Sequence, residues 1–206
     1  VEIRTPAETL TAPYVICSLP FAAMRNSVIL SPANADPVAA LRAEAINALP
    51  YTQIHQIHLA PETHFWEADG LPAEMWTDTA IERVFANHDE AGEIASLTCW
   101  VNGNGVRRGL SDEGWFDLAA TAFLKLRGAK VRGLKVVRWD ESQSFSGGAY
   151  THWAPGQIAA WAQQMGAPSG RLHFAGEHLS YLHTGMEGAM ESAERAAFEV
   201  AEAAAG

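Results

Sequence analysis

The feature that most constrains the fold of this chain is a strand, a glycine turn and a helix that follow one another towards its C-terminal end. The apolar segment Arg171–Ala175 is typical of a short strand, and Gly176 comes directly after it. The segment Met186–Ala205 is rich in Ala and Glu, which favour helix, and is predicted to be one. Gly176 permits a close approach to the backbone, because it carries no side chain. We therefore expect a strand, a glycine turn, a short loop and then a helix.

The beginning of this helix carries very few side-chain atoms, because its first turn contains Gly185, Gly188 and Ala189. A helix N-terminus has free backbone N–H groups and the positive end of the helix dipole, so a bare one suits an anionic ligand. Small residues at a helix start equally permit close packing against another element. The sequence leaves both interpretations open.

Strand and helix signals are mixed along the rest of the chain, which predicts an α/β or α+β fold. The run Tyr14–Leu19 is apolar, rich in β-forming residues and stopped by Pro20, and is predicted to be a buried strand. The other expected elements are the strands Val1–Arg4, Ile94–Val101 and Val131–Trp139, and the helices Val38–Leu49 (N-cap Asp36), Ser111–Arg127 (N-cap Ser111) and Gln157–Met165.

The segment 54–59 alternates with a period of two, as in a strand that is polar on one face. His55 and His58 would lie on opposite faces of this strand and could not share an ion, so we expect no metal site. The two faces are Ile54, Gln56 and His58 against His55, Ile57 and Leu59.

Composition excludes several classes of partner. The chain has 206 residues and a formal charge of −10 with no basic run, which argues against binding to nucleic acid or to an anionic membrane. No apolar segment approaches the roughly 20 residues of a membrane span. Cys17 and Cys99 are far apart and in no CxxC pattern, so we expect two small buried hydrophobic side chains rather than a disulfide or a zinc site.

Two long segments make the sequence recognisable. Gly170–His178 contains Phe-Ala-Gly-Glu, and His183–Ala197 contains Gly-Met-Glu-Gly-Ala followed by Glu-Ser and Arg-Ala-Ala. Together they resemble the C-terminal FAD-binding motif of the flavin monoamine oxidase and L-amino acid oxidase superfamily. Ala193 stands where glycine is usual, and Thr184-Gly185 stands where many members have Gly-Tyr or Gly-Trp.

Three further segments resemble the same superfamily, in the family's order and spacing. They are Tyr14–Pro20, Leu49–Trp66, and Ser146–Tyr150 together with Trp153–Gly156. The resemblance implies the C-terminal part of a Rossmann-like FAD-binding domain, residues 1–20 and 151–206, and a mixed-sheet substrate-binding domain, residues 21–150. The family's Gly-x-Gly-x-x-Gly motif is absent, since Gly103–Gly109 has Arg108 at the third glycine position. We therefore expect an N-terminal FAD-binding half, either as a separate chain or as a segment not contained in this sequence.

The resemblance also implies roles for individual residues. The cofactor is FAD, bound non-covalently because Ala149 stands where some relatives have the attaching cysteine. Glu177 is expected near the ribityl and pyrophosphate part of FAD, and Glu187 and Glu191 are expected to be first-turn acids that suit the helix dipole. The cofactor-binding residues implied are Gly176, Glu177, Gly185, Met186, Ala189, Trp153 and Pro155.

The substrate site implied by the resemblance is an aromatic cage with Tyr150 as one wall, although an ordinary core tyrosine is the alternative. The opposite wall is Gly185, so Trp153, Tyr181 and His183 are the candidates to complete the cage. Gln56 aligns with a lysine that bridges to the flavin through water; glutamine can hold a water but cannot act as a base. We assign Tyr150 and Gln56 as catalytic residues, and Tyr150, Trp153 and His183 as substrate-binding residues.

The activity implied is oxidative deamination of an amine, with hydride transfer from the amine Cα to flavin N5 and reoxidation by O2 to give H2O2. An L-amino acid oxidase is the alternative within the class, and a non-catalytic C-terminal fragment or subunit that needs a partner chain is the alternative outside it. We expect cytoplasmic localisation and a homo-oligomer of the complete enzyme.

Overall fold

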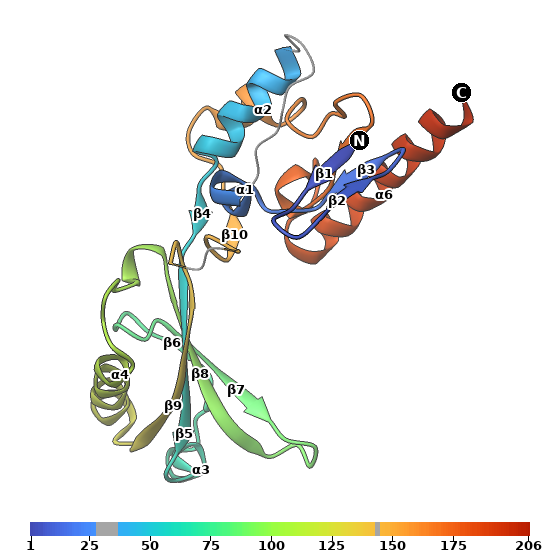
Figure 1. The fold of residues 1–206 in the computed structure, drawn as a ribbon. Helices are drawn as coiled ribbons and strands as arrows, with labels where there is room; N and C mark the ends of the chain where they lie inside the picture. The colour runs from blue at the N-terminus through green and yellow to red at the C-terminus, as the bar shows by residue number, and fades with distance from the viewer. Residues whose placement is uncertain (28–36, 143–144) are drawn as a thin grey trace. The chain divides into compact units, whose positions relative to one another are not determined.

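The structure is a computed structural model that describes residues 1–27, 37–142 and 145–206. Helices and strands are mixed, which confirms the predicted α/β class (Figure 1). The chain forms two compact units: unit 1 contains Val1–Tyr51 and Ser144–Gly206, and unit 2 contains Thr52–Gln143. The sequence-based boundaries, after residues 20 and 150, differ from these, since the described residues 21–27, 37–51 and 145–150 belong to unit 1. The roles assigned to the two parts stay predictions.

At the centre of unit 1, β3 (Val15–Cys17) pairs in parallel with β11 (Leu172–Phe174). The helix α6 (Gly185–Ala205) lies against β11 (Figure 1), as the strand–turn–helix pattern predicts. The predicted strand over Tyr14–Leu19 is shorter than expected and is not buried, since Ile16 is 44% exposed. The physical reason is that β3 and β11 form a two-stranded sheet within the described residues, whereas parallel strands are normally covered on both faces.

A small apolar core lies within unit 1, whereas its short strands Glu2–Arg4 and Thr9–Thr11 are exposed. The helix predicted over Val38–Leu49 is present as α2 (Pro37–Ala48), one residue earlier at each end, and its expected N-cap Asp36 lies outside the described residues. Cys17 is partly exposed rather than buried. The core contains Phe21, Met24, Leu49, Met165, Phe174 and Leu179. The other elements are β1 (Glu2–Arg4), β2 (Thr9–Thr11), α1 (Phe21–Ser27), α2 (Pro37–Ala48), β10 (Tyr150–Thr151), α5 (Gln157–Trp161) and the 3-10 helix η2 (Glu177–Leu179).

Unit 2 is a five-stranded sheet with one face covered by a helix. The strand order is β6-β7-β8-β5-β9 and every neighbouring pair is antiparallel, so the sheet is not mixed as expected. Ser111 caps α4 by accepting a hydrogen bond from the Gly114 N–H at 3.1 Å, as predicted. The elements are β5 (Ile54–Pro61), α3 (Phe65–Asp69), β6 (Met75–Trp76), β7 (Arg83–His88), β8 (Ile94–Asn102), the 3-10 helix η1 (Gly103–Gly105), α4 (Asp112–Arg127) and β9 (Val131–Trp139), with β4 (Tyr51–Thr52) where the chain passes between the units.

The two faces of β5 differ as the alternation predicts. Ile57 and Leu59 lie in the apolar core with Trp115 and Phe123 of α4. Gln56 and His58 point to the other face of the sheet and are partly exposed. Burial in the same core raises the pKa of the Cys99 thiol to about 12, which makes it an inert core side chain. Within the described residues, no helix combines the length and the apolar character needed to cross a membrane.

Candidate functional site

The turn after β11 requires glycine. Gly176 has φ 140°, and a Cβ at this position would lie 2.5 Å from the His178 ring. The Ser192 hydroxyl in α6 accepts a hydrogen bond from the Gly176 N–H at 2.8 Å and lies 2.9 Å from its carbonyl oxygen. Gly176 thus accommodates its own loop, and Ser192 ties this loop to the last helix.

The small residues in the first turn of α6 serve two purposes: one leaves open space and another permits close packing. Gly188 packs closely, because a Cβ there would lie 2.8 Å from the His183 carbonyl oxygen. Gly185, in contrast, has no atom within 4 Å of its Cβ position, and Met186 beside it is 85% exposed. Thr184 makes no side-chain cap. The space around Gly185 and Met186 at the tip of α6 is therefore open, whereas Gly188 serves packing.

Glu191 was expected in the first turn of the last helix, and the structure places it elsewhere. It lies beyond the first turn of α6, where Glu187 is the acidic residue. Its carboxylate accepts hydrogen bonds from the Ser180 hydroxyl and from the backbone N–H of Tyr181 at 3.0 Å. The Ser180 bond is the largest cause that lowers the pKa of Glu191. Glu191 therefore holds the loop between η2 and α6.

In unit 1, Glu177 is hydrogen-bonded to Thr151, the residue that follows Tyr150. The Thr151 hydroxyl lies 2.9 and 3.0 Å from the two Glu177 carboxylate oxygens and donates to them, and the Thr151 N–H lies 3.4 Å from Oε2. Tyr150, on the same short strand, is 42% exposed. Burial raises the pKa of the Tyr51 phenol, and the negative charge of Glu177 adds to this rise.

Two of the predicted cage residues share a hollow. Trp153 and Tyr181 line it together with Ser180 and residues of α5, and it has a volume of about 660 Å³. Trp153 also packs against the core of unit 1. His183 is exposed and does not line this hollow, and Pro155 is exposed in the loop before α5. Ala189 is partly buried, and its carbonyl oxygen lies 3.0 Å from the Ser192 hydroxyl.

His178 is a buried polar residue that sequence analysis did not assign a role. Its ring meets the edge of Phe21 at 4.4 Å between centroids, and burial lowers its pKa to about 4. Its Nε2 atom has no hydrogen-bond partner among the described residues. A neutral imidazole with an unused nitrogen therefore lies directly behind the Gly176 turn.

In unit 2, Gln56 is held by a residue that the sequence did not single out. The Trp139 indole N–H donates to Gln56 Oε1 at 3.1 Å. On the same face, the His58 Nδ1 atom lies 3.1 Å from the Thr98 hydroxyl, and burial is the largest cause that lowers the pKa of His58. No sequence signal marks Trp139, since its approach to Gln56 depends on the register between β5 and β9.

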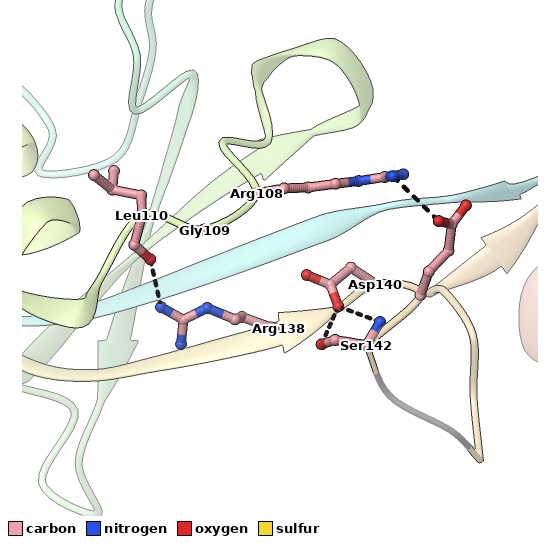
Figure 2. Close-up of a pocket in the computed structure, with 7 residues that line it drawn as sticks. Arg108, Gly109, Leu110, Arg138, Asp140 and Ser142 are labelled. Carbon is pink, nitrogen blue, oxygen red and sulfur yellow. Dashed lines mark hydrogen bonds and ion pairs between the residues drawn. The ribbon is translucent and has the colours of Figure 1, made fainter.

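Unit 2 contains a hollow of about 340 Å³, and the charged residues that line it are already paired (Figure 2). Arg108 pairs with Glu141 at 3.1 Å, and Arg138 donates to the Leu110 carbonyl at 3.0 Å. Asp140 accepts a hydrogen bond from the Ser142 N–H at 2.9 Å and is 2.8 Å from a buried histidine. These contacts stabilise β9 and residues 140–142, and each charged side chain that lines this hollow already has a partner among the described residues.

Comparison with known proteins gives one consistent family. A family model described as flavin containing amine oxidoreductase matches residues 1–201. An L-amino-acid oxidase of Siganus canaliculatus is 32% identical over 169 residues, covering 76% of this chain and 32% of the relative. An L-amino-acid oxidase of Naja atra is 26% identical over 97% of this chain and 40% of the relative.

Solved structures show the same fold. Cyclohexylamine oxidase from Brevibacterium oxydans IH-35A superposes with a TM-score of 0.78 at 19% identity, and the match covers 100% of this chain and 46% of that one. The chain thus spans less than half the length of each of these three proteins.

Proposed function

Because this chain belongs to the flavin containing amine oxidoreductase family, we propose that it is the C-terminal portion of an FAD-dependent enzyme that oxidatively deaminates an amine. When bound, FAD would accept a hydride from the substrate Cα and would pass both electrons on to O2, which is reduced to H2O2. The imine product then takes up water and releases ammonia, so amine, O2 and H2O give carbonyl compound, NH3 and H2O2.

The observation that carries the proposal is the open tip of α6. Thr184 makes no cap, Gly185 has free space around it, and the helix is 21 residues long, so its positive end is available. A helix N-terminus stabilises negative charge by about 0.3–1 kcal/mol, and by more where it is buried. This arrangement fits the electron-rich edge of a reduced flavin, and the unused nitrogen of His178 in the adjacent loop fits a site that is completed by further polar groups.

Within unit 1, the chain would also provide the aromatic groups for the substrate. Tyr150 is exposed, and Trp153 and Tyr181 share a hollow. Aromatic faces orient an amine and keep it away from bulk water. Orientation of the substrate is the main contribution the protein can add to the chemistry of the cofactor.

A second candidate is an L-amino acid as the substrate. The relatives named above with 26–32% identity are L-amino-acid oxidases, which favours this alternative. A third is that this polypeptide has no activity without a partner, because it spans 32–46% of the proteins named above and lacks the Gly-x-Gly-x-x-Gly segment. We propose that FAD is held non-covalently and jointly with an N-terminal half, on the same chain or on another.

Anaerobic reduction of the purified complete protein tests these proposals. We expect a yellow protein that releases FAD on acid precipitation and is bleached by one member of a panel of amines and L-amino acids. Readmission of air should restore the colour and produce H2O2. A protein that binds no flavin, or whose flavin no member of the panel reduces, would contradict the oxidase assignment.

A further inference from the structure

Gln56 and Trp139 are neighbours on the face of the unit 2 sheet that α4 does not cover. Ile54 of β5 is paired with Trp139 of β9, so Trp139 lies diagonally across from Gln56 on the same face. The indole Nε1 is 3.1 Å from the amide Oε1. Gln56 is otherwise flanked by Trp100 and Val137 on the adjoining strands.

The chemistry of the two groups fixes which end of the amide faces the indole. An indole N–H is only a donor, so it must meet the oxygen of the Gln56 amide and not the NH2 group. The terminal torsion of glutamine is otherwise broad, with no strong preference between the two ends. No described residue accepts a hydrogen bond from the Gln56 NH2 group. Trp139 therefore leaves the two amide N–H donors as the free end of Gln56.

We propose that Trp139 is a positioning residue that makes Gln56 a hydrogen-bond donor in the reaction, an inference that rests on the proposed function. A donor end binds a water through the oxygen of the water, so both O–H groups of this water stay free to donate to an acceptor. An amide turned the other way would bind the same water through a hydrogen and use up one of those O–H groups. The indole thus sets the direction of the hydrogen-bond chain that begins at Gln56.

A double-mutant cycle in the complete flavoprotein tests this role. We expect Trp139→Phe, which keeps an aromatic ring and removes the donor, to lower kcat by about three- to tenfold, in line with one hydrogen bond. KM and flavin content should stay within about twofold of the wild type, because no substrate or cofactor contact is removed. In a Gln56→Leu background, Trp139→Phe should have no further effect, because there is no amide to orient.

The matched control is Trp76→Phe. Trp76 lies on β6, is 79% exposed and stacks under Arg83, so the same substitution there removes an indole that does not face Gln56. Additive effects of Trp139→Phe and Gln56→Leu would overturn the inference. So would a loss of kcat in Trp76→Phe as large as that in Trp139→Phe.

A second readout needs no turnover. In the flavin-free complete protein labelled with 15N in the indole ring, the Trp139 resonance is identified by its loss in Trp139→Phe. Gln56→Leu should shift this resonance, and an unchanged resonance would show that the hydrogen bond does not form. If the wild type binds flavin but oxidises nothing, the proposed function fails and the role of Gln56 fails with it. If the wild type is active and the cycle is additive, only the present inference fails.

Discussion

The Ser192 hydroxyl and the backbone of Gly176 exchange hydrogen bonds across the strand–turn–helix unit, with distances of 2.8 Å to the amide nitrogen and 2.9 Å to the carbonyl oxygen. Ser192 is buried within α6, and Gly176 ends the short run after β11. A single side chain therefore fixes the glycine turn relative to the helix tip. The geometry of the proposed flavin site depends on these two hydrogen bonds, which hold the turn at Gly176 against α6.

Removing the Ser192 hydroxyl should destabilise the fold. In Ser192→Ala the Gly176 N–H loses its acceptor in a buried position, which costs about 1–3 kcal/mol of unfolding free energy. Denaturant unfolding of the complete protein measures this loss. Thr184→Ala is the control, because Thr184 makes no side-chain cap, and it should change stability by less than about 0.5 kcal/mol. Equal stability of the two variants would argue against the role of the hydroxyl.

A side chain at residue 176 should also be poorly tolerated. Gly176→Ala places a methyl group 2.5 Å from the His178 ring in a backbone conformation that L-residues rarely adopt. Backbone strain of this kind costs about 1–3 kcal/mol, and the collision adds to it. Gly170→Ala separates the two effects, since Gly170 also has a positive φ but has open space around it. A lower thermal midpoint for Gly176→Ala than for Gly170→Ala is the expected result.

Sequence patterns predicted those structural features that depend only on residues close together in the sequence. The N-cap at Ser111 and the alternation of β5 were predictable because a cap and a strand period are local features. The burial predicted for Tyr14–Leu19 was wrong, because burial depends on which elements pack against β3, and no local pattern shows that. The apolar side chains of Val15–Cys17 therefore predicted a strand but not the elements that pack against it.

The candidate site shows the same division. The tip of α6 was predictable from Gly185 and Gly188, whereas only the structure shows that one is open and the other packed. The contacts of Thr151 with Glu177 and of Trp139 with Gln56 join residues 26 and 83 positions apart. No local pattern encodes such pairs, because they arise from chain crossings and strand register.

Stability should depend on pH through His178. Burial lowers the pKa of His178 to about 4 in the folded protein from 6.5 in an unfolded chain. Between these values the unfolded state binds more protons, so stability falls as the pH decreases from 6.5 to about 4, by about 3 kcal/mol in total. His178→Gln removes this contribution. Unfolding curves at pH 7 and pH 4.5 should show a smaller loss for the variant than for the wild type, and parallel losses would contradict burial of a neutral imidazole.

The polarity of Gln56 can be reversed directly. Gln56→Glu keeps the acceptor for Trp139 but replaces the free N–H donors with a second carboxylate oxygen. Gln56→Lys retains donors at this position. We expect kcat to fall by more than about tenfold in the glutamate variant and to stay within about threefold of the wild type in the lysine variant, as measured with the best substrate of the panel. A glutamate variant as active as the lysine variant would show that donor polarity at residue 56 is irrelevant.

Thr151 should control the affinity for FAD through Glu177. The Thr151 hydroxyl donates a hydrogen bond to the Glu177 carboxylate at 2.9 Å, and this contact can be tested without a substrate. Thr151→Val keeps the shape of the side chain and removes the donor, which frees Glu177 to adopt other rotamers, so we expect FAD to bind about tenfold more weakly to the apoprotein. Thr151→Ser retains the hydroxyl and should bind FAD within about twofold of the wild type. Titration of both apoproteins with FAD, followed by flavin fluorescence, separates the cases. The role of Glu177 at the cofactor is contradicted if the valine and serine variants bind FAD equally well.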